Sequence, residues 1–138
     1  MANPLLGTGL GAVPVTALYG GLTALLTVGL AMNISRMRGK HNVLRGDGGI
    51  PELQGAIRAH GNAAEHVPLA ILLLLLAELC GGSSLVLHVL GGAFLVARII
   101  HPIGLIKQIS AGQVVGAMGT YLTQIALAGY TLWLRPWG

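Results

Sequence analysis

The sequence predicts an all-α protein, an integral membrane four-helix bundle that occupies residues 1–138 as a single domain. Of its 138 residues, 54% are hydrophobic and only 9% are charged, whereas about a quarter of the residues in an ordinary soluble domain are charged. The mean hydropathy is +0.76. A chain of this length accommodates four spans of about 20 residues with short connections, which leaves no room for a separate soluble domain.

The first two spans are delimited by proline, glycine and basic residues. The first is predicted over residues 15–34, after Pro14, and it ends at a basic cluster that begins with Arg36. Its apolar run is too long for a cleaved signal peptide, and its positive flank follows the run instead of preceding it. The second span, residues 52–79, follows the turn-forming sequence GDGGIP and stops before a pair of glycines.

The third span is predicted over residues 84–100 and ends at His101 and Pro102. A short connection containing Lys107 leads to the fourth span, residues 114–134. The chain has 22 glycines, some of them four residues apart, as in GQVVG at the start of the fourth span. This spacing favours close helix contact, and four thin helices enclose little interior, so we expect a homo-oligomer.

The charges predict the orientation of the bundle in the membrane. Seven of the eight Lys and Arg residues lie at or near the first and third loops, and only Arg135 lies on the other side. The positive-inside rule places both loops in the cytoplasm and both termini outside. The basic residues flank membrane spans and have no aromatic stacking platform beside them, so nucleic acid is not an expected partner.

One polar block, RAHGNAAEHVP, runs directly into an apolar stretch. Charge so close to lipid must face other helices, a watery cavity or a ligand. Arg58, Asn62 and Glu65 are spaced i, i+4 and i+7, so they share one helix face. The third helix adds Arg98 and His101 at the same depth, and the first helix adds basic residues. The planar guanidinium of arginine can bind a carboxylate, glutamate can bind an ammonium group, and asparagine can bind a peptide group. This set of side chains therefore matches a small peptide with carboxylates and an ammonium group. The alternative is that the same groups join helices through hydrogen bonds and an ion pair.

The single cysteine and two of the histidines are not predicted to bind a ligand or a metal. The single Cys80, at a predicted helix end, is interpreted as an ordinary small apolar residue. His88 has no obvious ligand partner in the third span, and His41 lies in a predicted loop. No His, Cys or carboxylate pair has a familiar ligand spacing, so no metal site is predicted.

The block R-A-H-G-N-A-A-E, followed by H-V-P-L and an apolar run ending in E-L, resembles the signature of the MAPEG family, the membrane-associated proteins in eicosanoid and glutathione metabolism, and especially its bacterial branch. G-D-G-G upstream, A-R-I-I-H-P-I-G-L after the third span and G-A-M-G-T in the fourth are similar to segments of bacterial members. The resemblance covers roughly residues 15–134.

The resemblance implies a homotrimer in a bacterial inner (plasma) membrane that binds glutathione between protomers near the cytoplasmic face. Glutathione is then expected as co-substrate or ligand, with lipophilic molecules arriving from membrane lipid. By resemblance, Arg58, Asn62 and Glu65 match the family's glutathione-binding residues of the second helix, and Arg98 and His101 match the arginine and histidine that close the third. The candidate ligand-binding residues are Arg36, Arg58, Asn62, Glu65, His66 and His101, and the candidate thiolate stabilisers are Arg38 and Arg98. Arg38 is a better match than Arg36 for the family's basic residue at the end of the first helix.

Two departures from the family pattern concern catalysis. Gln113 occupies the region where catalytic members carry a thiolate-stabilising arginine, and Leu105 stands near the position of a family tyrosine. Lowering the pKa of a thiol requires a nearby cation or a strong donor. The candidate cations are Arg36, Arg38 and Arg98, and Tyr121 is a distant candidate donor. The expected function is therefore glutathione binding, with transferase or peroxidase activity on lipophilic electrophiles. The alternatives are a non-enzymatic scaffold or regulator of the same family and a small transporter subunit.

Overall fold

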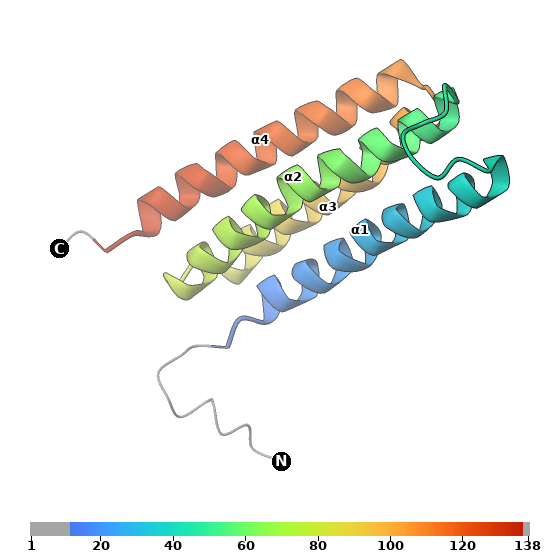
Figure 1. Cartoon of the computed structure of the whole chain (residues 1–138). Helices are drawn as coiled ribbons and strands as arrows, with labels where there is room; N and C mark the ends of the chain where they lie inside the picture. Colours follow the sequence, from blue (N-terminus) through green and yellow to red (C-terminus); the bar gives the residue numbers. More distant parts are fainter. Residues whose placement is uncertain (1–11, 137–138) are drawn as a thin grey trace, which may run out of the picture.

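The computed structural model describes residues 12–136, which form four α-helices that run alternately up and down (Figure 1). The helices are α1 (Pro14–His41), α2 (Pro51–Leu79), α3 (Ser84–Ile106) and α4 (Ser110–Leu134). α2 and α3 form the middle of the bundle, while α1 and α4 lie on opposite sides and make no contact with each other within the described residues. The predicted all-α four-helix bundle is confirmed.

Three of the helices are long and apolar enough to cross a membrane. They are α1, α2 and α3, whose most apolar stretches have mean hydropathies of 1.7, 1.5 and 1.9. The remaining helix, α4, has 25 residues and no charged side chain, but it includes two glutamines and three threonines. Its length is sufficient to span, at about 1.5 Å per residue, so the fourth span stays a prediction.

The helices extend beyond the apolar spans at the end that carries the α1–α2 and α3–α4 connections, here called the connection end. α1 continues past residue 34 to His41, where Asn42 adopts a left-handed conformation with φ 54°. α3 continues through Pro102 to Ile106, and α4 begins earlier than expected, at Ser110. Hydropathy detects the membrane segment, whereas a helix ends where its carbonyls find other partners, and basic side chains stabilise the last turn of α1.

The opposite end of the bundle, here called the termini end, is closed by a carboxylate. Glu78, near the end of α2, accepts hydrogen bonds from the backbone N–H groups of Val15 (2.9 Å) and Thr16 (2.7 Å). These are two of the first N–H groups of α1, which have no partner inside their own helix, and the first turn of α1 has no acidic residue of its own. A negative charge at this position also complements the positive end of the helix dipole.

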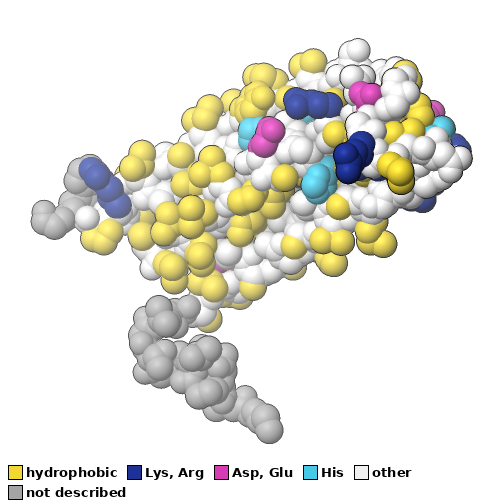
Figure 2. All heavy atoms as spheres, in the orientation of Figure 1, with side chains coloured by type: hydrophobic (Ala, Val, Ile, Leu, Met, Phe, Trp, Pro, Cys, Tyr) yellow, Lys and Arg dark blue, Asp and Glu magenta, His cyan; other side chains and the backbone are white. Residues whose placement is uncertain are grey.

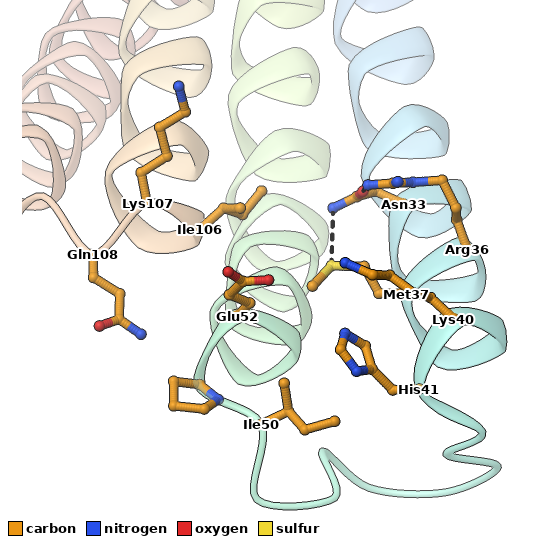
Figure 3. A pocket seen from close by; sticks show the side chains of 11 residues that line it. Asn33, Arg36, Met37, Lys40, His41, Ile50, Glu52, Ile106, Lys107 and Gln108 are labelled. Atoms are coloured by element: carbon orange, nitrogen blue, oxygen red, sulfur yellow. Dashed lines mark hydrogen bonds between the residues drawn. The ribbon is translucent and has the colours of Figure 1, made fainter.

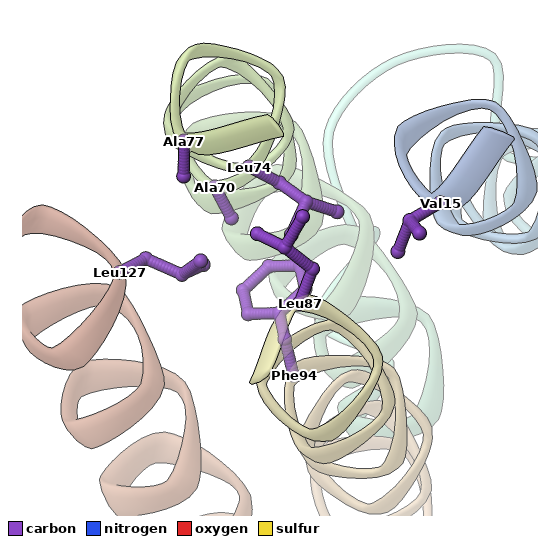
Figure 4. Close-up of a cluster of buried hydrophobic side chains, with 7 residues drawn as sticks. All are labelled: Val15, Ala70, Leu74, Ala77, Leu87, Phe94 and Leu127. Carbon is purple, nitrogen blue, oxygen red and sulfur yellow. The ribbon is translucent and has the colours of Figure 1, made fainter. Parts of the chain in front are cut away.

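A cluster of buried apolar side chains fills the termini half of the bundle (Figure 4). Leu74, Leu87, Phe94 and Leu127 are each 1% exposed and bring α2, α3 and α4 together. The connection half contains two smaller clusters, in which alanines and Leu53 of α2 pack against single residues of α1. The larger apolar cluster therefore holds the termini half, while the alanines of the other half leave room for polar groups.

Glycines let α3 and α4 approach closely at the connection end. A Cβ atom added to Gly104 would overlap the backbone of Gly112 and Gln113, and one added to Gly116 would overlap His101. Any larger side chain would push the helices apart, since the overlaps are with backbone and Cβ atoms. The close contact predicted from the glycine spacing is thus present inside the protomer. Self-association is a separate expectation.

Charged and apolar surfaces are separated along the molecule. Figure 2 shows most of the charged and histidine side chains gathered toward the connection end, while hydrophobic side chains cover the rest of the visible face. Leu25 and Leu85 are each 73% exposed and Trp133 is 72% exposed. Such exposure fits helices whose outer faces contact lipid or another protomer.

Candidate functional site

The most unusual residue of the bundle is Arg98 of α3, which is 0% exposed. Its Nη1 donates a 2.8 Å hydrogen bond to Oδ1 of Asn62 on α2. Its Nε and Nη2 atoms are buried and have no hydrogen-bond partner among the described residues. Within the described residues, the only hydrogen-bond partner of this guanidinium is the amide of Asn62. The remaining N–H donors are of the kind that bind a carboxylate.

Two further charges lie on the same face of α2 as Asn62. Arg58 and Glu65 are exposed, while Asn62 is half-buried. Neither Arg58 nor Glu65 forms a hydrogen bond or an ion pair within residues 12–136. The predicted stripe is therefore present, but only Asn62 joins helices inside the protomer. The two charged members stay available for a ligand or a second protomer.

His101 lies one turn beyond Arg98 and is 7% exposed. Its Nδ1 is 3.0 Å from the backbone carbonyl oxygen of Gln113. Because a carbonyl only accepts, Nδ1 carries the proton of this bond, and Nε2 of the neutral ring is left as an acceptor. Nε2 of Gln113 in turn donates to the carbonyl of Gly104 at 3.2 Å. Gln113 therefore joins α3 to α4 by hydrogen bonds, in the region where catalytic members of the family are expected to carry an arginine.

His66 of α2 is held against α4 by a pair of hydrogen bonds with Gln124. The side-chain nitrogen of Gln124 donates to the backbone carbonyl of His66 at 2.9 Å, and its oxygen is 2.9 Å from Nδ1 of the His66 ring. The ring also packs against Tyr121, with centroids 5.6 Å apart. Gln124 was absent from the sequence prediction. The available signal was an amide in the middle of a helix that has no charged residue.

Arg58 lines two cavities at the connection end. One, of about 460 Å³, lies between α2, α3 and α4 and also includes Gln54 and Gln113. The other, of about 280 Å³, includes Arg38 of α1 and Asp47 of the α1–α2 connection together with Gln54. Arg38 is oriented by a 3.3 Å hydrogen bond from its Nη2 to the Gly46 carbonyl. The structure thus brings Arg38 and Arg58 together, and it adds Gln54, which the sequence prediction did not include.

Arg36 lies elsewhere. It lines a separate cavity of about 950 Å³ between the end of α1, the start of α2 and the end of α3 (Figure 3). Its Nη2 donates to Oδ1 of Asn33 at 2.9 Å. Arg36 and Arg38 are two residues apart, which places them about 200° apart around α1. One arginine therefore faces the Arg58 cavity and the other faces this second cavity.

We define the polar cluster as Arg58, Asn62, Glu65, Arg98 and His101. It supplies two guanidinium groups, an amide, a carboxylate and an imidazole on α2 and α3. Of its members, Arg58 shares a cavity with Arg38, whereas the other four line none of the cavities described. The guanidinium groups can hold carboxylates, and the carboxylate can hold an ammonium group.

The chain is similar to known proteins over most of its length. The MAPEG family model matches residues 16–133, which include every member of the polar cluster. The chain belongs to the MAPEG family. It is 37% identical over 123 residues to the inner membrane protein YecN of Escherichia coli strain K12, and the match covers 89% of this chain and 94% of that protein. YecN of Escherichia coli O6:H1 matches to the same extent.

Family membership confirms the resemblance seen in the sequence and accounts for the co-occurrence of the polar block with a four-helix membrane fold. It does not assign roles to single residues. The assignments of Arg58, Glu65, His66 and Arg98 stay predictions based on their chemistry and their positions.

Proposed function

We propose that this MAPEG protein binds glutathione in the membrane at the polar cluster, as co-substrate or ligand, and that the site is completed in a homotrimer. The observation that carries the proposal is the burial of Arg98 with Asn62 as its only described partner. A buried charge without a counter-charge is destabilising by several kcal/mol. A ligand carboxylate would supply both the counter-charge and the missing acceptors.

Glutathione matches the cluster group by group. It carries two carboxylates, one ammonium group, two peptide groups and a thiol. Arg98 and Arg58 would hold the carboxylates, Glu65 would hold the ammonium group, and Asn62 would bond a peptide group. Arg38, which shares a cavity with Arg58, would extend the cationic surface towards the ligand.

A second protomer is needed because Arg58 and Glu65 are exposed on a helix that is apolar enough to span the membrane. Exposure of these charges to hydrocarbon is unfavourable by at least about 2.5 kcal/mol each. A neighbouring protomer would cover this face and enclose the ligand. The trimer of the family is the assembly we expect, and the exposed apolar side chains leave ample surface for it.

The chemistry we propose is conjugation of the thiol to lipophilic electrophiles that enter from the bilayer. The thiol loses its proton to solvent, the thiolate sulfur attacks the electrophilic carbon, and the leaving group departs with the bonding electrons. Arg98 and Arg38 are the cations that would favour the thiolate. A peroxide would be reduced when the thiolate attacks one of its oxygens: the O–O bond breaks, the alkoxide takes a proton from water, and the sulfur becomes a sulfenic acid. A second glutathione then converts the sulfenic acid to the disulfide with loss of water.

A second candidate, a scaffold or regulator that binds without catalysis, is favoured by one observation. Gln113 is neutral and is engaged with Gly104 and His101, so it supplies no charge to a thiolate. A thiol-conjugation assay on the purified protein separates the two candidates. In the variant Gln113→Arg, a faster rate would place the thiolate near α4, whereas an unchanged rate would mean that the site is inactive or that Arg36, Arg38 or Arg98 activates the thiol.

The location we propose is a bacterial inner membrane, as in the name of the relative YecN. The connection end would face the cytoplasm, because seven of the eight Lys and Arg residues lie at or toward it. A cytoplasmic connection end would open the polar cluster toward the cellular thiol pool.

The test is a titration of purified protein in detergent with glutathione and two analogues. S-methylglutathione keeps both carboxylates and the ammonium group and should bind, whereas the diethyl ester lacks both carboxylate charges and should lose at least about tenfold in affinity. Equal binding of the ester, or no binding of glutathione, would refute the proposal. An assay with an aromatic chloride electrophile then measures conjugation.

A further inference from the structure

The cavity lined by Arg36, here called the basic cavity, is not used by the proposed thiol site. Its lining comes from three elements that meet at the connection end: the last turns of α1, the first turn of α2 and the end of α3 (Figure 3). Its charged residues are Arg36 and Lys40 of α1, Lys107 after α3 and Glu52 of α2. Three permanent cations therefore share this space with one carboxylate.

These cations form no ion pair within residues 12–136. No ion pair joins Glu52 to Lys40 or Lys107 among the described residues, although all three line the same cavity. In Figure 3, Glu52 lies between the α1 side chains on one side and Lys107 on the other. Glu52 has a structural reason to be there, because it occupies the first turn of α2, where a negative charge complements the helix dipole. Lys40 likewise complements the negative end of the α1 dipole, because it lies in the last turn of that helix. The feature that calls for a partner is that Arg36, Lys40 and Lys107 gather from two parts of the chain around one cavity.

Exposed apolar side chains lie one helical turn from the basic residues of this cavity, on the side of the membrane spans. Met32, one turn before Arg36 on the same side of α1, is 67% exposed. Ile103, one turn before Lys107 on α3, is 48% exposed. A cationic pocket at the end of the spans, with exposed apolar side chains directly beyond it, matches a molecule that has a negative head and apolar tails.

We propose that the basic cavity binds the phosphate headgroup of an anionic membrane phospholipid, of the phosphatidylglycerol type, with its acyl chains along Met32 and Ile103. Basic pockets between membrane helices are suited to such headgroups, and each Lys or Arg near an anionic surface strengthens binding about fivefold. Lys40 and Lys107 hold the phosphate oxygens from opposite helices. The lipid then bridges α1 and α3 across the start of α2.

The experiment uses full-length protein, purified in detergent and stripped of lipid. Thermal melts and native mass spectrometry are recorded with short-chain phosphatidylglycerol, short-chain phosphatidylcholine and inorganic phosphate. We expect phosphatidylglycerol to raise the melting temperature and to remain bound, while the other two probes have little effect. An equal effect of inorganic phosphate would identify a free-anion site, and an equal effect of phosphatidylcholine would identify non-specific apolar binding. Either result overturns the proposal.

Matched variants localise the effect. Lys40→Gln and Lys107→Gln should each weaken phosphatidylglycerol binding about fivefold, and Glu52→Gln should strengthen it, since the repulsive carboxylate is removed. Arg45→Gln is the control, because Arg45 carries the same charge at the same end but lines none of the cavities described. An equal loss in Arg45→Gln, or weaker binding in Glu52→Gln, would overturn the assignment to this cavity.

Discussion

The two halves of this bundle are built in different ways from the same four helices. In the termini half, leucines and Phe94 interlock from three helices, and Glu78 closes the end of α1 with two hydrogen bonds. In the connection half, alanines and glycines bring backbones together, and Arg98, His101 and Gln113 make the polar contacts. The comparison indicates that stability comes mainly from the termini half, and that the connection half is arranged around polar groups that are incompletely satisfied.

The largest effect on stability is expected in the apolar cluster. Phe94→Ala removes a side chain that is 1% exposed at the centre of the termini half. We expect the free energy of unfolding in detergent to fall by about 3–5 kcal/mol, with unchanged glutathione affinity in the protein that stays folded. The matched control is Leu85→Ala on the same helix, since Leu85 is 73% exposed. A comparable loss in the control would mean that the cluster is not the main source of stability.

The next largest effects concern ligand affinity in the connection half. Arg58→Ala and Glu65→Gln should each reduce glutathione affinity by about 1.5–3 kcal/mol, the range for hydrogen bonds to charged groups. Calorimetric titration measures this, and native mass spectrometry checks that the oligomer is intact.

The opposite outcome for these two variants is also specific. If Arg58 and Glu65 pair with protein groups of a neighbouring protomer, each change strands a buried charge and destabilises the oligomer by about 3–5 kcal/mol. Dissociation of the oligomer without a specific loss of affinity would place both residues in the assembly and not in the ligand site.

The smallest effect is expected at the end of α1. Glu78→Gln keeps one acceptor oxygen but removes the charge that faces the N–H groups of Val15 and Thr16. We expect a loss of about 1 kcal/mol in the free energy of unfolding and no change in ligand affinity. A thermal melt measures the loss. A decrease in affinity would show that the two halves are coupled more strongly than their packing suggests.

The sequence was sufficient to predict the number and order of the helices, because apolar segments of spanning length are separated by glycine, proline and basic residues. It did not predict where the helices end at the connection end. α1 continues to His41 and α3 passes through Pro102, since a helix does not stop where its side chains become polar. Those ends depend on local backbone partners, such as the left-handed Asn42.

The candidate site was predictable only in part, because the sequence shows which residues share a helix face but not how the helices pack. Spacing alone placed Arg58, Asn62 and Glu65 on one face of a helix. It did not reveal that Arg98 is fully buried, or that Gln124 binds His66 across 58 residues of sequence. Both features depend on how separate helices pack, and the periodicity of one helix gives no information about that packing.

The proposed site depends on the pairing of the buried Arg98 guanidinium with a ligand carboxylate, and the variant Arg98→Met removes that pairing. Melting of the ligand-free protein and titration with glutathione are measured on the same preparation. Replacing a buried, unpaired charge with an apolar side chain of similar length should leave the melting temperature unchanged or raise it. Glutathione affinity should fall by at least about tenfold. A lower melting temperature with unchanged affinity would contradict the account, because it would show that Arg98 is paired inside the assembled protein.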